Sequence, residues 1–562
     1  MSNIKRLYFY GVAFAALLVA ANGVSTMLGP LIGRVLSQHF LVGNIATPVS
    51  LGLAMIIPGI PLWLLHWSAT QRYVARGQEE PGSALRKLYL YAVLFIAAVV
   101  ALTSAMPIIR WFLGTQDGGS LGDAFARFLV WGVVWSYHWR VEGAEGQPTA
   151  DAKTLRRWYL YVTSAYGLAT LVVGIGMVVA VLLGGIYAAI FPGITIGGAP
   201  SLWREITKQG IAFIALGGLW WGFHWIYAAR GDQDSVLRQV YLYLFAVLGG
   251  IATVLVTLGI LLYQVLRFLL GGVDVSAQAH FQFLSGVLSP LLVGGGLWVY
   301  HWRIVQEEGA RVTSRLMGAG RSYRYIMAAL GLSSLCTGTT ILIGVLIGFL
   351  DSLAASPLLY AGHWWQSTFS ASLSTLIVGL PVWVYYWNTA QATALQGNQA
   401  ERSALPRRLF LYLVLGAAML GLLVNLSFVL FRFLDGLIQG TLSMDVLRNS
   451  RWNLGVLATA AVFLGYYWNI LRQDQSAGAE AASRRKEVLV LVSEKGATLL
   501  SQLEEALGTR SRVLYDISSD EEPPALSPEQ LQQLSDRVAA APGRKVLLVV
   551  GSQGVTVHPY RD

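Results

Sequence analysis

The stretch Trp298-Val-Tyr-His301-Trp302 closes a long apolar run, and the chain writes its pattern six times. Each copy has a large apolar residue, then His or Tyr three positions later, then Trp. The other copies are Trp63…His66-Trp67, Trp135…His138-Trp139, Trp221…His224-Trp225, Trp383…Tyr386-Trp387 and Leu464…Tyr467-Trp468. A pattern repeated over most of the chain indicates a protein built from tandem structural repeats.

A second repeated stretch opens the apolar runs: a basic residue followed by alternating aromatics, as in Arg86-Lys-Leu-Tyr89-Leu-Tyr91. Together the two stretches delimit twelve apolar runs in six pairs, each pair forming a helical hairpin. The first helices are expected near 6–36, 86–114, 156–191, 239–271, 322–350 and 407–437. The second helices are expected near 47–67, 121–139, 209–228, 281–303, 367–387 and 452–471.

Composition agrees with a polytopic membrane protein. Of the 562 residues 55% are apolar and only 12% are charged, whereas a soluble domain averages about 25% charged. The one cysteine, Cys336, excludes an internal disulfide framework and a Cys-based zinc site. The net charge of +10 comes from basic residues between apolar runs, where they set topology, so we expect no nucleic-acid partner.

The distribution of basic residues predicts the orientation of the chain. Loops between the pairs carry about twice as many Lys and Arg residues as the loops within them, and the positive-inside rule places such loops in the cytoplasm. Both termini are therefore expected in the cytoplasm, and all six hairpins share one orientation. The first apolar run is too long for a signal peptide and is expected to be a retained membrane helix.

Alternate pairs resemble one another more closely, as Pro61-Leu-Trp63 and Pro381-Val-Trp383 show. This longer period predicts three four-helix membrane units at 1–150, 151–310 and 311–472. They would be parallel repeats, not the inverted repeats of many transporters. The Arg-Lys-Leu-Tyr-Leu-Tyr starts and His-Trp-Arg ends resemble those of a bacterial membrane domain family, domain of unknown function 5671. The resemblance covers three copies over about residues 4–472, implies a bacterial inner-membrane protein, and carries no activity or site residues with it.

The composition changes after the last apolar run. Residues 473–484 read as a polar linker, and residues 485–562 as a small cytoplasmic α/β domain of order βαβαββ. Its strands are expected at 487–492, 512–517, 545–550 and 555–559, with helices at 497–507 and from Pro528. Ser527, Pro528 and Gln530 make a favourable helix start. The expected fold class is thus all-α in the membrane, with about twelve spanning helices and an α/β domain appended.

Four of the six repeated motifs carry a histidine that could hold haem or a metal: His66, His138, His224 and His301. The interpretation we favour is an interfacial aromatic belt, whose tryptophans are Trp67, Trp139, Trp225, Trp302, Trp387 and Trp468. Two motifs have Tyr386 and Tyr467 in place of His, and phenol is a poor substitute for imidazole on most metals. We therefore predict no metal, no cofactor and no catalytic residues. The helix-start tyrosines should pack on the His-Trp ends.

Four arginines recur at the opposite ends of the first helices: Arg34, Arg110, Arg267 and Arg432. They could contact an anion or a lipid headgroup. The alternatives are snorkelling of the side chain and interaction with the helix dipole.

The spans are nearly free of charge, which argues against transport driven by ions. The leading hypothesis is a non-enzymatic membrane scaffold or sensor whose residues 485–562 contact a cytoplasmic protein partner. The alternatives are a channel or transporter for a small neutral or lipidic solute, and a haem or metal protein using the repeated histidines. Membrane lipids are expected partners, and a homo-oligomer remains open.

Overall fold

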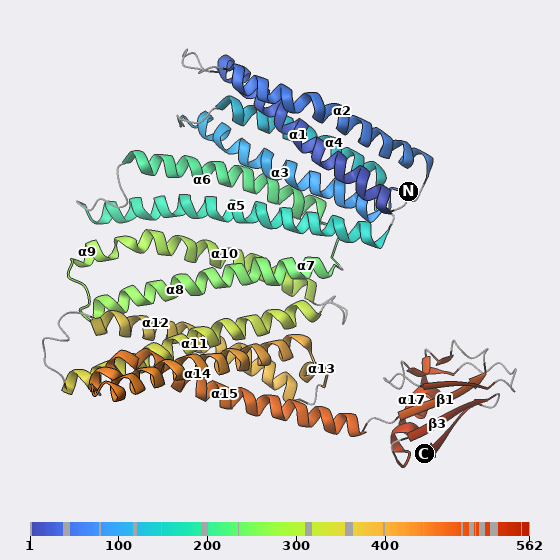
Figure 1. Cartoon of the computed structure of the whole chain (residues 1–562), viewed down its shortest axis with the longest axis vertical. Helices are drawn as coiled ribbons and strands as arrows, with labels where there is room; N and C mark the ends of the chain where they lie inside the picture. Colours follow the sequence, from blue (N-terminus) through green and yellow to red (C-terminus); the bar gives the residue numbers. More distant parts are fainter. Residues whose placement is uncertain are drawn as a thin grey trace. The chain divides into compact units, whose positions relative to one another are not determined.

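The computed structural model describes the chain with gaps (Figure 1). The described residues are 3–36, 45–77, 80–115, 121–147, 149–192, 200–233, 235–309, 317–354, 364–396, 399–441, 443–484, 487–493, 499–500, 502–504, 512–516, 526–543, 545–551 and 554–560. They fall into two compact units, which we describe separately. The first is Met1–Ala390 with Ser427–Val456, and the second is Gln391–Leu426 with Leu457–Asp562.

Long helices account for almost all of the membrane-like region. In the first half of the chain they are α1 (Asn3–Leu36), α2 (Ala46–Arg76), α3 (Ala84–Phe112), α4 (Leu121–Glu145), α5 (Ala150–Ile190), and α6 (Pro200–Trp221) with its π-helical end η1 (Gly222–Ala228). Next come α7 (Val236–Val240), π-helix η2 (Tyr241–Val247) and α8 (Leu248–Leu269) as one rod, then α9 (Ala277–His280), η3 (Phe281–Phe283) and α10 (Leu284–Gly309). The last are α11 (Met317–Ala354), α12 (Trp364–Leu395), α13 (Gln399–Arg402), α14 (Leu405–Ile438) and α15 (Met444–Arg484).

Eleven of these helices are long and apolar enough to cross a membrane. The expected span that does not qualify is α4, which carries Asp123 and Arg127 in its first two turns. Several second helices also extend beyond their expected ends: α2 continues to Arg76 and α15 to Arg484. The segment 473–484, expected as a linker, is therefore helical, because Gln, Ala and Glu are good helix formers.

The helices of the first unit pack as hairpins that join into four-helix groups. Helix α1 packs on α2, α3 on α4, α5 on α6, and α8 on α10. In addition, the first helix of a group packs on its fourth: α1 on α4 and α5 on α10. Helix α11 meets α15 in the same way, since Asp351 forms an ion pair with Arg448. In Figure 1 the hairpins α1–α2, α3–α4, α5–α6 and α8–α10 of the first unit follow one another in the order of the chain.

Glycines allow the closest of these contacts. A Cβ on Gly167, Gly250 or Gly331 would lie 2.8, 2.8 or 2.5 Å from the backbone nitrogen of Trp221, Trp298 or Trp383. Each of these tryptophans opens a repeated motif. The same backbone-to-backbone approach therefore fixes three of the hairpins, in the manner of small-residue packing in membranes.

The C-terminal domain, within the second unit, is a four-stranded sheet of order β2-β1-β3-β4. Its strands are β1 (Glu487–Ser493), β2 (Arg512–Asp516), β3 (Lys545–Gly551) and β4 (Gly554–Tyr560). Strand β1 is parallel to both β2 and β3, while β3 and β4 form an antiparallel hairpin. Residues 499–500 and 502–504 are helical, and α17 (Pro528–Ala540) begins with the predicted capping box of Ser527 and Gln530. The elements follow the predicted order.

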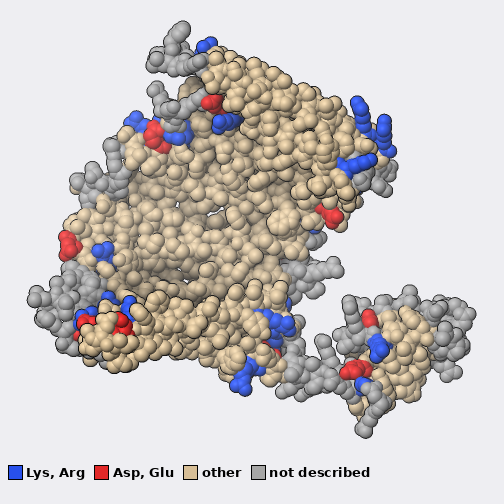
Figure 2. All heavy atoms as spheres, in the orientation of Figure 1, with Lys and Arg blue, Asp and Glu red and all other residues tan. Residues whose placement is uncertain are grey.

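Charged side chains gather at the two ends of the long helices, and the surface between them is almost free of Lys, Arg, Asp and Glu on the face drawn in Figure 2. The many exposed Leu, Val, Ile and Phe side chains include Leu64, Leu182 and Leu219. A broad uncharged apolar surface of this kind is typical of a protein that contacts hydrocarbon.

Candidate functional site

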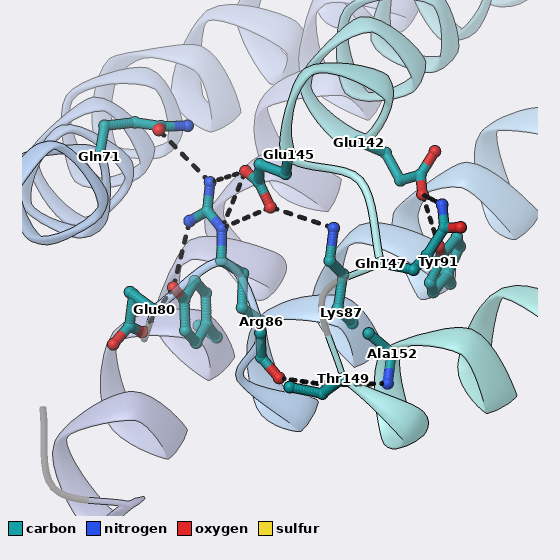
Figure 3. Close-up of polar contacts among 12 residues, drawn as sticks. Gln71, Glu80, Arg86, Lys87, Tyr91, Glu142, Glu145, Gln147, Thr149 and Ala152 are labelled. Carbon is teal, nitrogen blue, oxygen red and sulfur yellow. Dashed lines mark hydrogen bonds and ion pairs between the residues drawn. The ribbon is translucent and has the colours of Figure 1, made fainter. Parts of the chain in front are cut away.

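A network of buried charges lies at the end of the first helix group where α3 begins (Figure 3). The side chain of Arg86 is fully buried and forms a two-pronged ion pair with Glu145 of α4. Lys87, also fully buried, donates to the same carboxylate at 3.2 Å. The Nη1 atom of Arg86 donates to the Tyr10 hydroxyl at 3.1 Å, and its Nη2, which also contacts Glu145, donates to the Gln71 side-chain oxygen at 3.3 Å. Three elements outside α3 thus hold one guanidinium.

The face of the Arg86 guanidinium is covered as well as its edge. Its central carbon lies 5.1 Å from the centre of the Trp67 ring, and Trp67 is 4% exposed. Cation–π contact suits arginine better than lysine because the guanidinium is planar and weakly hydrated. The protein itself therefore contacts both the edge and the face of this buried guanidinium.

The second helix group repeats this site. Arg238 of α7 donates to Glu308 of α10 at 3.0 and 2.7 Å and to the Ala229 carbonyl at 3.2 Å. Its guanidinium carbon lies 4.3 Å from the centre of the Trp225 ring. Ala229 stands four residues after Trp225, as Gln71 does after Trp67. The backbone carbonyl therefore replaces the glutamine oxygen.

The third copy of this site belongs to the third helix group, in the part that falls within the second compact unit. Arg407 of α14 is fully buried and pairs with Asp474 of α15 at 2.6 Å. It also donates to the Gln391 side-chain oxygen at 2.8 Å, and Gln391 stands four residues after Trp387. One Arg–carboxylate site therefore occurs in each of the three predicted four-helix units.

A second carboxylate joins the site from the loop before Arg86 and from the loop before Arg238. Tyr10 donates to Glu80 at 3.0 Å while accepting from Arg86, and Arg6 pairs with Glu80 at 3.0 Å. In the second group Tyr161 donates to Asp232 at 2.8 Å, and Arg157 pairs with Asp232 at 2.6 Å. In these two helix groups, positive and negative side chains therefore alternate across the end of the bundle.

The acids of this network recur at regular spacings in the sequence, a pattern separate from the aromatic motifs. An acid follows the motif His or Tyr by seven residues in alternate pairs: Glu145 after His138, Glu308 after His301 and Asp474 after Tyr467. Another acid precedes each buried arginine by six residues: Glu80 before Arg86, Asp232 before Arg238 and Glu401 before Arg407. This spacing could have suggested the acid–arginine pairs, which we did not predict, but it carries no information about their burial.

The repeated histidines make two kinds of hydrogen bond. The Nδ1 atoms of His138, His224 and His301 lie 2.8, 2.9 and 3.0 Å from the carbonyl four residues earlier. Carbonyls only accept, so these nitrogens carry the proton and Nε2 is left as an acceptor. Tyr89 donates to Nε2 of His138 at 3.3 Å, and Tyr159 to Nε2 of His224 at 3.0 Å. The predicted packing of helix-start tyrosines on the histidines is confirmed.

Tryptophan side chains also donate hydrogen bonds to tyrosines that open the helices. The indole N–H of Trp63 donates to Tyr89, that of Trp135 to Tyr159 and that of Trp221 to Tyr241. A metal bound by His138 or His224 would have to displace the tyrosine hydroxyl from Nε2. Among the residues that the structure describes, no group of three or more His, Cys, Asp or Glu side chains could hold a metal ion. The hydrogen bonds of His138 and His224 link the two helices of their hairpins.

Removing one hydroxyl from this hydrogen-bonded series should lower the stability of the protein measurably. We expect Tyr89→Phe to lower the free energy of unfolding by about 1–3 kcal/mol, because it leaves Trp63 and His138 without their shared partner in a buried site. Thermal unfolding in detergent, followed by tryptophan fluorescence, measures the change. Tyr8→Phe is the matched control: Tyr8 is exposed and 3.5 Å from half-buried His66, so its effect should stay within about 0.5 kcal/mol. Equal effects would contradict a structural role for the buried chain.

The predicted belt tryptophans divide into two sets. Trp67, Trp225 and Trp387 are buried at 4%, 4% and 1% exposure, so they do not face outward as belt residues would. Trp139 and Trp302 are half-buried, and Trp468 is exposed. The three buried tryptophans end the first, third and fifth motifs along the chain. Trp67 and Trp225 cover the buried arginines Arg86 and Arg238.

The predicted outer arginines are placed at the far helix ends. Arg34 is exposed, and Arg110 lies 3.8 Å from Glu205. Arg267 donates to the Gly272 carbonyl at 3.0 Å, and Arg432 donates to the Asn449 carbonyl. Arg267 thus binds a carbonyl just beyond its own helix, as a cation near a helix C-terminus is expected to do.

Comparison with known proteins identifies the family but no characterised relative. No curated protein and no solved structure matches the chain. The model of one family, described as a domain of unknown function (DUF5671), matches three segments: 6–133, 157–296 and 321–462. Each match lies within one of the predicted four-helix units and spans both of its hairpins. The three matches cover well over half of the chain, which therefore belongs to the DUF5671 family as a protein with three tandem copies of its domain.

Proposed function

We propose that the protein is a non-enzymatic integral membrane scaffold or sensor of the bacterial inner membrane. The observation that carries this proposal is the pairing of charge. The buried cations Arg86, Arg238 and Arg407 each bind a carboxylate at a helix end. A transporter driven by ions needs charged groups inside its spans, and a hydrolytic enzyme needs a reactive group open to substrate. Neither is supported by a network whose charges are satisfied internally.

Twelve spanning helices with both termini in the cytoplasm are part of this proposal. Helix α4, the least apolar of the twelve, has 25 residues and would be about 37 Å long, enough to cross hydrocarbon. It packs on both α1 and α3, and half-buried Asp123 lies against Gly29 of α1. Arg127 is exposed near the start of the helix, from where its side chain can snorkel toward the headgroups. The positive-inside bias then places the buried arginine networks at the cytoplasmic side.

The C-terminal domain is proposed as the contact to a cytoplasmic protein. Strand β2 is an edge of the sheet and exposes Leu514 and Tyr515 at 46% and 53%. Edge strands with unpaired backbone groups can receive a strand from a partner. The other edge strand, β4, carries Pro559 near its end, which limits pairing there.

The test compares the proteins crosslinked in cells to the full-length chain and to a chain that ends at Arg484. We expect a specific partner to be lost on truncation and strongly reduced by Leu514→Lys. The thermal unfolding of the helical region should be unchanged in both variants, which serves as the control for folding. Identical crosslinked proteins in all three samples would rule out the domain as the contact.

A channel or transporter for a small neutral or lipidic solute is the second candidate. Its specific support is an apolar groove between α8, α11 and α12. Flux of a panel of neutral solutes into proteoliposomes would favour this candidate. Absence of flux with correctly inserted protein would leave the scaffold proposal.

A further inference from the structure

An apolar groove runs along α8 where the second helix group meets the third. Its volume is about 470 Å³, within the range of binding pockets for small organic ligands. Three helices line it: α8 from Ala252 to Tyr263, α11 from Leu330 to Ser334, and α12 from Ala371 to Val382. Of the glycines in the lining, Gly259 faces open space, since nothing lies within 4 Å of an added Cβ, whereas Gly331 and Gly379 allow α11 and α12 to pack closely.

The serine and threonine hydroxyls in the groove are already hydrogen-bonded, so its lining is chemically suited to an apolar chain. Ser334 donates to the Thr375 carbonyl at 3.0 Å. Thr375 and Ser374 donate to the Ala371 carbonyl at 2.6 and 3.1 Å. None of the lining residues is charged. The groove also lies in the middle of helices that are apolar enough to span a membrane, where the surrounding solvent would be lipid hydrocarbon.

The far end of the groove offers groups that fit a phosphate-bearing headgroup. Arg267 follows the lining residue Tyr263 by one helical turn, and its Nε binds the Gly272 carbonyl. In the described part of the chain, the side-chain oxygen of Gln366 is buried and has no hydrogen-bond partner. A Cβ on Gly272 would lie 3.0 Å from the Gln366 Cβ and 3.2 Å from the Arg267 Cγ. A guanidinium donor and an unsatisfied acceptor therefore flank one loop.

A related groove lies between the first and second helix groups, and it differs from the groove along α8 in the charges near its end. It measures about 330 Å³ and is lined by α3, α5 and α6, ending at Met106. Arg110 again follows by one turn, but Glu205 accepts from Lys208 at 2.8 Å and from Thr115 at 2.7 Å beside it. A carboxylate already occupies the position of an anion there, whereas no ion pair of Arg267 is found among the described residues.

We propose that the groove between α8, α11 and α12 binds one membrane phospholipid. One acyl chain lies in the groove, the phosphate binds Arg267, and a hydroxyl or ammonium donor of the headgroup binds the Gln366 oxygen. This inference rests on the proposed membrane insertion and not on the proposed partner contact. Binding would fill the seam between two helix groups with hydrocarbon.

The test is native mass spectrometry of the full-length protein with added phosphatidylglycerol or phosphatidylethanolamine. Gly259→Phe should abolish the bound-lipid peak, because a Cβ at Gly259 has nothing within 4 Å and the ring would occupy the groove. Gly249→Phe is the matched control on the same helix, since Gly249 is equally open but does not line the groove. Arg267→Gln should weaken binding about tenfold, as expected when a charge-assisted contact is lost.

The outcomes are separable. Lipid retained equally by Gly259→Phe and Gly249→Phe would overturn the site. Lipid lost equally by both would also overturn it, because the groove would then not be the cause. A protein that does not fractionate with membranes would overturn the insertion on which the inference rests. Loss of a cytoplasmic partner would bear only on the proposed scaffold function.

Discussion

Replacing Arg238 by Met should lower the free energy of unfolding by about 3–5 kcal/mol, the cost of leaving a buried carboxylate without its partner. Arg238 is 7% exposed, and the side chain of its partner Glu308 is 13% exposed. The three hydrogen bonds from Arg238 to Glu308 disappear in the variant, and so does the stacking of the guanidinium on Trp225. Chemical unfolding in detergent, followed by tryptophan fluorescence, measures the loss.

Two controls distinguish the effect of breaking the buried ion pair from the effect of removing any arginine charge. Arg157→Met breaks an ion pair whose arginine side chain is 35% exposed, so the loss should be only about 0–1 kcal/mol. The double variant Arg238→Met with Glu308→Met should recover most of the stability, because no unpaired charge remains. A loss in the double variant as large as the sum of two single losses would contradict this account of the network.

Substituting Gly250 by Val should destabilise the hairpin of α8 and α10 by about 1–3 kcal/mol, and more if the helices separate. A Cβ at Gly250 would lie 2.8 Å from the Trp298 nitrogen and 2.9 Å from the Gly294 carbonyl oxygen. Both are backbone atoms, so no side chain can rotate away to make room. Thermal unfolding in detergent measures the effect.

The neighbouring residue is the natural comparison. Gly249 lies on the same helix, is exposed, and has nothing within 4 Å of an added Cβ. Gly249→Val changes helix propensity as Gly250→Val does, so the difference between them isolates the close approach. If the two variants unfold alike, close helix approach does not stabilise this hairpin.

The aromatic motifs predict some features of the structure correctly and others wrongly. The motif Trp221…His224-Trp225 predicted a helix end beside the tyrosines that open the hairpin, and the Tyr159 hydroxyl does contact His224. The tryptophans that end the six motifs were all predicted to form one interfacial belt, yet Trp225 is buried while Trp468 is exposed. Identical local patterns do not distinguish these positions, because burial depends on which other helix covers each face.

Repeat number, hairpin pairing, family and the α/β order at the C-terminus follow from the sequence by itself, because apolar runs, caps and repeated spacings are local properties of the chain. Only the tertiary structure decided that Arg86 pairs with Glu145 across 59 positions, and that Gly250 meets the Trp298 backbone. It also decided that the groove along α8 is open while the end of the related groove holds Glu205. These features depend on side chains and backbone from separate helices reaching the same few ångströms, and no single stretch of sequence encodes that distance.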